Sequence, residues 1–581
     1  MRWIVRGALL FILAFANLND IWSPDVVPNT LLVWSLAREG DLDLDEFTIP
    51  DGAPTGPGYA GIPRQTYYFR ACGISTFTGT PSAPRSLGGP PPPGPNDHVC
   101  SIFPPGISLL AVPVLLPFVV ADPAASDLAL LVQSGHFAAA VLETLAALLL
   151  WSVVRRFTTA RWALGLVLVY WLGTSVRTVA SQALWQHAGV HLAIALALWL
   201  VLHERPATLA RELLAGITLG FGVVARQTTA LVALAAVRVP RLDAAWPSIG
   251  LLAGVAIGAL PLLLYQQLAF GSAFESGYGA KPFDAPVLSG IYALLLSPSR
   301  GLLVYEPWAA FGLVSLALAW RRPGHVAERL RSLGVSWIAL LLLYATYAEW
   351  WGGRVFGPRF LDDLAPLIVV ALAWGIGQGV LARTWSRVLF WLAAAWSLLI
   401  FNAAAFVYDP AGWDTVPINV NFHPERLLDW SDPQWLSVLA SLPAADLRVV
   451  VAALLSAYTT RSPNTPIFLA CGSMGGGLCW KLAENKTVVP RLSGLLLLGS
   501  HWDDAFFASP AFRRKVPVFF GHGSRDTVFP IEKQEAFFRS IQAKSPSYPA
   551  RFVRFETGTH GTPIRMTDWR ETLNWMLLAA R

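Results

Sequence analysis

Long apolar runs alternate with short polar turns through the first three quarters of the chain. Runs such as LLAGITLGFGVVA and LIVVALAWGIGQGVLA carry no charged residue, and a helix that crosses a bilayer needs about 20 mostly apolar residues. The pattern predicts an α-helical polytopic membrane domain at residues 1–440. Its expected spans are about eleven, at 3–19, 127–154, 162–178, 185–203, 209–226, 228–240, 246–268, 302–320, 333–349, 362–381 and 386–407.

Composition supports this fold class and divides the chain in two. Of 581 residues, 54% are hydrophobic and 14% are charged, whereas soluble proteins have about 25% charged residues. Residues 1–441 carry 26 basic and 27 acidic side chains, and residues 442–581 carry 17 and 10. The net charge of +6 therefore belongs to the end of the chain. We expect two domains, 1–440 and 441–581, with a lipid bilayer and no nucleic acid as partner.

Arginine positions orient the predicted spans, because cytoplasmic loops carry an excess of basic residues. Arginines gather in alternate turns at Arg2, Arg6, Arg155, Arg156, Arg161, Arg205, Arg211, Arg238, Arg241, Arg321, Arg322, Arg329, Arg331, Arg383 and Arg387. This orientation requires residues 101–121 to form an interfacial or re-entrant helix. It places the loop 20–101, and everything after about residue 408, outside the cytoplasm. As an alternative, residues 1–16 are a signal peptide, since Ala14-Phe15-Ala16 has the small residues of a cleavage site.

The loop 20–101 holds two cysteines and two notable acids. Cys72 and Cys100 lie in the compartment where disulfides persist, so we expect them to pair, the alternative being two free thiols. Asp20 and Asp25 follow the first span directly, in NLNDIWSPDVVPN. A carboxylate there can deprotonate an acceptor hydroxyl or hold a divalent cation. The alternative is that both acids are simply solvated at the end of a span.

Basic side chains recur in the other predicted outer loops, against the usual trend. They are His187 in SQALWQHAG, Arg226 at the end of a span, Arg300 in SPSRGLLVYEPW, and Arg354 and Arg359 in WWGGRVFGPRF. A guanidinium matches the oxygens of a phosphate, so the number of these residues indicates a lipid-linked phosphate ligand. Taken singly, an arginine at a helix end more often keeps its charge at the interface than binds a ligand.

These motifs, in this order, resemble the C-type glycosyltransferases, the polytopic superfamily that includes protein O-mannosyltransferases. The likeness covers residues 1–440 and rests on WSPDVVPN, IFPPGISLLAVP, SQALWQHAG, SPSRGLLVYEPW, WWGGRVFGPRFLDDLAP and NFHPERLLDWSDPQW. It implies a bacterial inner-membrane enzyme with a polyprenyl-phosphate sugar donor and an extracytoplasmic acceptor. It also implies that Asp25, with Asp20 in reserve, is the base or metal ligand. The superfamily often pairs its acids, whereas these lie apart in sequence, which leaves the need for a metal open.

The end of the chain follows a different pattern, with a nucleophile candidate at a sharp turn. TPIFLACGSMGGGLCWKLA predicts a buried strand, a turn carrying Ser473, and a helix. VPVFFGHGSRD then places Asp526 after a strand, and ARFVRFETGTH does the same for His560. The order Ser, Asp, His resembles the C-terminal half of α/β-hydrolases of the dienelactone hydrolase or carboxylesterase kind, about residues 445–581.

The resemblance implies that Met474 supplies one oxyanion N–H, while the loop that supplies the second N–H belongs to strands this chain lacks. We therefore expect a partial hydrolase domain whose sheet has an unpaired edge. Three classes of function compete: a lipid-dependent glycosyltransferase, a membrane-tethered serine esterase, and a transporter or other non-enzymatic membrane protein. The first is favoured because polar residues concentrate in the predicted outer loops. The best transporter-like pair is His136 and Glu143, seven residues apart in one span.

Overall fold

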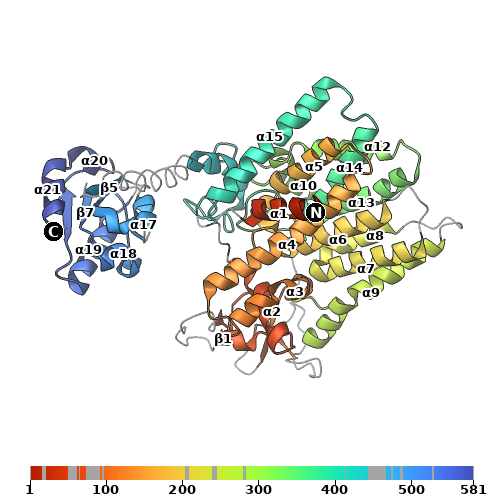
Figure 1. Ribbon diagram of the computed structural model, residues 1–581, viewed down its shortest axis with the longest axis horizontal. Coiled ribbons are helices and arrows are strands. Elements are labelled where there is room, and N and C mark those ends of the chain that lie inside the picture. Colours follow the sequence, from red (N-terminus) through yellow and green to blue (C-terminus); the bar gives the residue numbers. More distant parts are fainter. Residues whose placement is uncertain are drawn as a thin grey trace. The chain divides into compact units, whose positions relative to one another are not determined.

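The computed structural model divides the chain into two compact units, Met1–Ser441 and Leu442–Arg581. The first is almost entirely helical, and the second contains a parallel β-sheet (Figure 1). The structure describes residues 2–15, 21, 23–49, 62–64, 66–73, 92–93, 97–202, 208–237, 245–278, 283–410, 412–442, 466–472, 476–484, 488–526 and 529–579.

A helix occurs in each of the eleven segments predicted to span. The helices of the first unit are α1 (Arg2–Phe15), α2 (Val27–Arg38), α3 (Gly106–Ala121), α4 (Leu128–Val154), α5 (Ala160–Leu172), α6 (Gln186–Val201), α7 (Leu209–Ala225), α8 (Ala230–Ala236), α9 (Ala245–Phe270), α10 (Val287–Leu296), α11 (Leu302–Tyr305), α12 (Ala309–Ala319), α13 (His325–Ala345), α14 (Ala365–Gly377) and α15 (Thr384–Val407). The segment 101–121, predicted as an interfacial or re-entrant helix, corresponds to α3.

Three of these helices are long and apolar enough to cross a membrane: Leu128–Val154, Ser248–Phe270 and Thr384–Val407. The expectation of eleven such helices is therefore not met by length and composition among the described residues. Most of the others are shorter than the apolar runs that predicted them. The run at 302–320, for example, divides at Pro307 into α11 and α12, and the run at 162–178 leaves the α-helix after Leu172.

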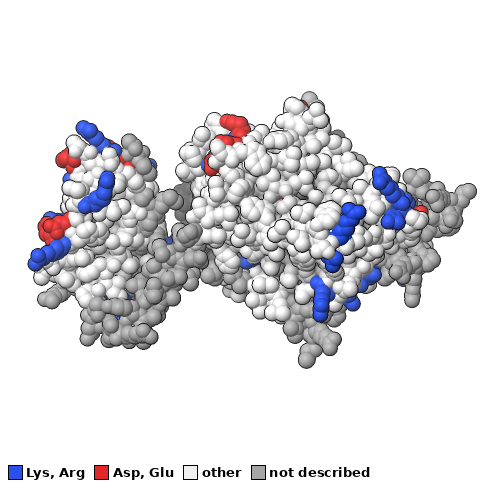
Figure 2. Space-filling model, turned by 90° about the horizontal axis from the view of Figure 1, so that it is seen from above, with Lys and Arg blue, Asp and Glu red and all other residues white. Residues whose placement is uncertain are grey.

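The surface of the first unit suits a lipid environment. Large apolar side chains are exposed along many helices, including Leu116, Val120, Leu145, Leu214, Leu234, Ile257, Val314, Ile338, Leu392 and Leu399. Figure 2 shows that most of the visible surface of this unit carries neither basic nor acidic side chains. Exposed apolar patches of this kind mark a membrane or partner surface rather than a water-facing one.

Helices α7 and α9 pack against each other through glycine. Gly216 and Gly220 in α7 face Gly254 and Gly258 in α9, and a Cβ at any of the four would lie 2.2–2.4 Å from a carbonyl oxygen of the other helix. Glycines four residues apart let two membrane helices approach backbone to backbone. This pair therefore depends on small residues and not on large side chains.

The 20–101 loop contains α2 and two small sheets. β1 (Thr48–Ile49) pairs in parallel with β2 (Ile62–Pro63), and β3 (Phe69–Cys72) pairs antiparallel with β4 (His98–Ser101). Cys72 and Cys100 form a disulfide between β3 and β4. The loop thus has its own covalent link and a buried cluster that includes Trp34, Phe47 and Phe69.

The second unit is a four-stranded parallel sheet with strand order β5-β6-β7-β8. Its strands are β5 (Ile467–Gly472), β6 (Leu492–Leu498), β7 (Val518–Gly523) and β8 (Ala550–Phe555), and its helices are α17 (Gly476–Glu484), α18 (Pro510–Arg513), α19 (Ile531–Lys544), α20 (Thr562–Met566) and α21 (Trp569–Ala579). Strands β6 and β7 are buried almost throughout, as central strands of a parallel sheet are. Among the described residues β5 pairs with β6 alone, so it is an edge strand.

Candidate functional site

Asp25 lies just before α2 and faces the guanidinium of Arg359, which is 334 positions later in the sequence. Its Oδ2 lies 3.2 Å from both Nη1 and Nη2 of Arg359. Its Oδ1 accepts a hydrogen bond of 3.4 Å from the hydroxyl of Tyr67 in the 20–101 loop. Desolvation and the Asp25 carboxylate raise the pKa of Tyr67 above its ordinary value, so the hydroxyl stays protonated and donates.

Arg359 is held between aromatic rings. Its guanidinium carbon lies 5.0 Å from the ring centre of Trp185 and 5.3 Å from that of Phe360. The side chain is only 11% exposed, and its Nε has no hydrogen-bond partner among the described residues. Gly352, at φ +71°, lies against this nitrogen, where a Cβ would come within 2.8 Å of Nε. The glycine therefore leaves room for the arginine side chain. The Nε–H of Arg359 stays unpaired among the described residues.

A second cationic group lies on the same ring, Phe360. The guanidinium carbon of Arg226 is 5.3 Å from the centre of Phe360, and its Nε is 3.0 Å from Oδ2 of Asp363. His187 Nδ1 lies 2.7 Å from the other oxygen of Asp363, and its Nε2 lies 3.2 Å from Arg226 Nη1. Arg226 also donates to the hydroxyl of Tyr344, at 2.7 Å. Two guanidiniums thus pack against Phe360, one paired with Asp25 and the other with Asp363.

Four of the residues predicted from sequence therefore belong to two linked pairs. Asp25 pairs with Arg359, and Arg226 contacts His187. The two arginines share the ring of Phe360. Sequence reasoning did not select Tyr67, Trp185, Phe360, Asp363 or Tyr344 as site residues. Trp185 lies two positions before His187, and Phe360 directly follows Arg359. This closeness in sequence is the signal that could have identified them. Tyr67 carries no such signal, because its contact with Asp25 depends on the fold of the loop.

The other predicted site residues of the first unit are Arg300, Arg354 and Asp20. Arg300 is 2% exposed, and its terminal nitrogens bond to Asp414 at 2.7 Å and to Gln434 at 2.6 Å. Protein groups already bond to its guanidinium, as they do to that of Arg226, so its assignment as a phosphate ligand stays a prediction. Arg354 is exposed, on the same turn as Arg359. Asp20 lies outside the described residues.

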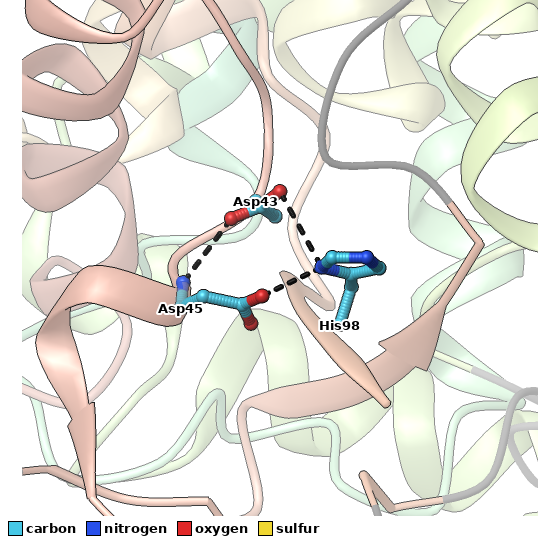
Figure 3. A group of neighbouring side chains, drawn as sticks. All are labelled: Asp43, Asp45 and His98. Atoms are coloured by element: carbon cyan, nitrogen blue, oxygen red, sulfur yellow. Dashed lines mark hydrogen bonds and ion pairs between the residues drawn. The ribbon is translucent and has the colours of Figure 1, made fainter. Parts of the chain in front are cut away.

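A separate cluster in the 20–101 loop has the residue types of a metal site. Asp43, Asp45 and His98 each direct one ligand atom toward a common point, and these atoms lie within 4.8 Å of one another (Figure 3). His98 Nδ1 is 2.6 Å from Oδ2 of Asp45 and 3.9 Å from Oδ2 of Asp43. Burial, followed by the charge of Asp45, raises the pKa of Asp43 to about 7.

In the second unit, the acid and the histidine predicted for a hydrolase lie together. Asp526 follows β7 and His560 follows β8, and His560 Nδ1 is 2.8 Å from Oδ2 of Asp526. His522 Nε2 is 3.4 Å from the same oxygen. Ser473 and Met474 lie outside the described residues. Cys471 and Cys479, on β5 and α17, form a second disulfide.

Comparison of the chain with protein-family models, curated proteins and solved structures finds no match. Function is therefore argued from the geometry of the two groups just described. In the first unit Asp25 pairs with Arg359, whose neighbour Arg226 pairs with Asp363, and in the second unit Asp526 pairs with His560.

Proposed function

We propose that residues 1–441 form an integral-membrane glycosyltransferase that moves a sugar from a polyprenyl-phosphate donor to an extracytoplasmic acceptor. The observation that supports this most is the contact of Asp25 with Arg359, beside Arg226 and His187. An acid that accepts a proton and cations that bind a phosphate are the two groups that such a transfer needs.

In the proposed reaction, the acceptor oxygen attacks the sugar carbon that carries the phosphate. The acceptor proton passes to Asp25, the bond from the sugar carbon to the phosphate oxygen breaks, and its electron pair leaves with the phosphate. Arg359 stabilises the negative charge on that leaving group. As the alternative, the Asp25 carboxylate holds a divalent cation.

Because Arg359 is paired with Asp25, binding of the donor phosphate to Arg359 also changes the contacts of Asp25. A phosphate that accepts from both terminal nitrogens of Arg359 competes with Asp25 for them. Binding of the donor then releases Asp25 Oδ2 for the acceptor hydroxyl. The order in which the substrates bind is therefore donor first.

We also propose that the eleven helical segments span the membrane, with the 20–101 loop and the second unit outside the cytoplasm. All four cysteines are joined in two disulfides, one in this loop and one in the second unit. Disulfides persist in oxidising compartments. The arginine pattern places both regions on that side independently of the cysteines.

Membranes that contain the full-length protein, incubated with labelled polyprenyl-phosphate sugars, test the transfer directly. We expect label to move from the lipid fraction to an acceptor in these membranes and not in membranes that carry Asp25→Asn. Equal transfer by both membranes, or none from hexosyl or pentosyl donors by either, would contradict the proposal.

A membrane-tethered serine esterase is the second candidate, and it concerns the other unit. It is supported by the 2.8 Å contact of His560 Nδ1 with Asp526 Oδ2, which is the acid–histidine pair of a catalytic triad. Ser473 is the serine that the sequence pattern assigns to this role, and Met474 the source of an oxyanion N–H.

The third class, a transporter, draws less support from Glu143. This carboxylate is fully buried in α4, 2.6 Å from His191 Nδ1 and 2.9 Å from the hydroxyl of Tyr170. A carboxylate with both oxygens bonded to neighbouring helices fixes their packing. The ring of His136 lies 4.7 Å from that of Phe15.

A further inference from the structure

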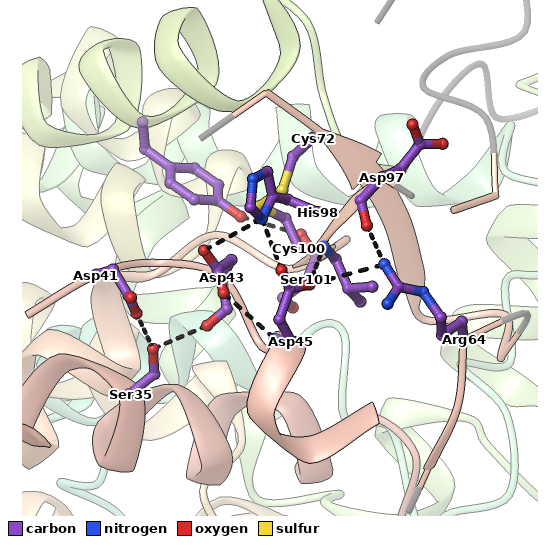
Figure 4. Close-up of a disulfide and its surroundings, with 12 residues drawn as sticks. Ser35, Asp41, Asp43, Asp45, Arg64, Cys72, Asp97, His98, Cys100 and Ser101 are labelled. Carbon is purple, nitrogen blue, oxygen red and sulfur yellow. Dashed lines mark hydrogen bonds and ion pairs between the residues drawn. A yellow bond between two sulfur atoms is a disulfide. The ribbon is translucent and has the colours of Figure 1, made fainter. Parts of the chain in front are cut away.

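The segment that follows α2 gathers negative charge in a small volume. Glu39, Asp41, Asp43, Asp45 and Glu46 fall within eight positions. Asp41 is bonded to the hydroxyl of Ser35, and Asp43 and Asp45 turn instead toward His98 on β4 (Figures 3 and 4). The acids and the histidine are more than 50 residues apart, so tertiary structure alone brings them together.

Each aspartate uses one oxygen to fix its orientation and directs the other to the shared point. Asp43 Oδ1 accepts from the backbone N–H of Asp45, at 3.2 Å. Asp45 Oδ1 accepts from the backbone N–H of Val99, at 2.8 Å, and Arg64 lies 3.9 Å from that same oxygen. The Oδ2 atoms of both aspartates then face Nδ1 of His98. Outer bonds of this kind hold ligands in place for a metal.

One of these oxygens has nothing to bond to. Asp43 is 3% exposed, and its Oδ2 has no hydrogen-bond partner among the described residues. The 3.9 Å to His98 Nδ1 is too long for a hydrogen bond. A buried carboxylate oxygen left without a partner requires an explanation, and a bound cation is one.

His98 Nδ1 and Asp45 Oδ2 share a hydrogen bond of 2.6 Å, and a small cation bound there would take the place of its proton. Four-coordinate zinc with bonds of about 2.0 Å keeps neighbouring ligand atoms about 3.3 Å apart. The two contacts of His98 Nδ1, 2.6 Å and 3.9 Å, lie on either side of that value. Two carboxylates and an imidazole favour zinc or a similar transition ion, because calcium takes oxygen ligands.

We propose that Asp43, Asp45 and His98 bind one divalent transition-metal ion of the zinc class, with a solvent molecule in the open position. The His98 side chain is 42% exposed, which gives the ion a path from solvent. The site joins the segment after α2 to β4, next to the disulfide of Cys72 and Cys100 (Figure 4). Its role is to clamp the loop that also carries Tyr67, and it needs no part of the proposed transfer.

Zinc binding to the purified full-length protein, stripped of metal by a chelator, tests the site. A fluorescent zinc chelator as competitor measures stoichiometry and affinity. We expect one tightly bound Zn²⁺ per chain, and at least a tenfold weaker affinity in Asp43→Asn and in His98→Gln. His98 is partly exposed, so the second variant is the one that tests the site if Asp43→Asn fails to fold.

His423→Gln is the matched control. His423 Nδ1 also lies close to a carboxylate, 3.0 Å from Oε1 of Glu425, and both side chains are exposed. Among the described residues, this pair has no third side chain placed to share a metal ion with it. This variant should bind zinc like the parent. Equal zinc titrations of the parent and His98→Gln, or no bound zinc in the parent, would overturn the proposal.

Discussion

Asp25 and Arg359 are separated by 334 positions, yet they form an ion pair in which one carboxylate oxygen faces both terminal nitrogens. Partly exposed ion pairs contribute little to stability, typically below about 1 kcal/mol. The pair is thus better explained as a binding arrangement than as a stabilising one. Its two members can be tested separately, because each has a different task in the proposed transfer.

Replacing Asp25 by asparagine removes the charge and keeps the shape. We expect transfer to fall by at least about 100-fold, as it does when a general base is lost, while the amount of protein in the membrane stays unchanged. Immunoblotting and the labelled-donor assay measure the two quantities on the same membranes. Glu425→Gln, at an exposed acid, is the control and should transfer normally. Transfer by Asp25→Asn at the parent rate would remove Asp25 from the site.

Replacing Arg359 by lysine keeps the charge and loses the planar fork. We expect the donor concentration at half-saturation to rise about tenfold, because one ammonium cannot replace two parallel N–H donors. Arg387→Lys, at an exposed arginine at the start of α15, should saturate like the parent. If Arg359→Lys also saturates like the parent, Arg359 does not bind the phosphate through two bonds.

At the scale of elements, α7 and α9 show how close helices come in this unit. Gly254 is in contact with the backbone of α7: a Cβ there would lie 2.2 Å from the carbonyl oxygen of Leu213. Backbone cannot give way as a flexible side chain does. The two helices must therefore separate if either glycine row is enlarged.

We expect Gly254→Ala to destabilise the first unit by about 1–3 kcal/mol, the usual cost of overpacking. Gly334→Ala in α13 is the matched control, since its nearest neighbour would be a Leu316 methyl group at 3.6 Å, an ordinary contact. Thermal unfolding of the detergent-solubilised protein, followed by loss of monodisperse material, compares the two. Equal midpoints would show that α7 and α9 pack less closely than described.

At the scale of the whole molecule, the proposed orientation makes a labelling prediction. A cysteine near residue 325, introduced as Pro323→Cys, should be shielded from impermeant thiol reagents in intact cells. A cysteine near residue 410, introduced as Pro410→Cys, should react. The background is low because all four native cysteines are in disulfides. The opposite result would invert the orientation and move Asp25 to the cytoplasm. It would thereby contradict the proposal of a lipid-linked donor outside the cytoplasm.

The second unit makes the last prediction. An active Ser473 would react with a fluorophosphonate probe, because His560 would withdraw its proton. Among the described residues β5 is an edge strand, and an incomplete sheet offers little support for a catalytic triad, so we expect weak or no labelling of the intact chain. Ser473→Ala should leave sugar transfer unchanged, since the two units share no chemistry. Strong labelling that Ser473→Ala abolishes would establish an esterase as a second activity.

Prediction from sequence succeeded where the signal is local. Apolar runs located every helix that was expected, because a helix satisfies its own backbone and its position depends on neighbouring residues. The strands that precede Asp526 and His560 were likewise visible as short apolar runs. The glycine spacing in α7 and α9 was also present in the sequence, at positions 216, 220, 254 and 258, and was not used.

The sequence by itself determined the helical class of the first unit, the change of composition near residue 441, and the acids and arginines to consider. Only the tertiary structure decided which of them meet. It brought Arg359 to Asp25 and bonded Arg300 to Asp414, although both are arginines of predicted outer loops. It also joined His98 to Asp43 and Asp45. The reason is physical: partners more than 50 positions apart are chosen by packing of the whole chain, which no local pattern records.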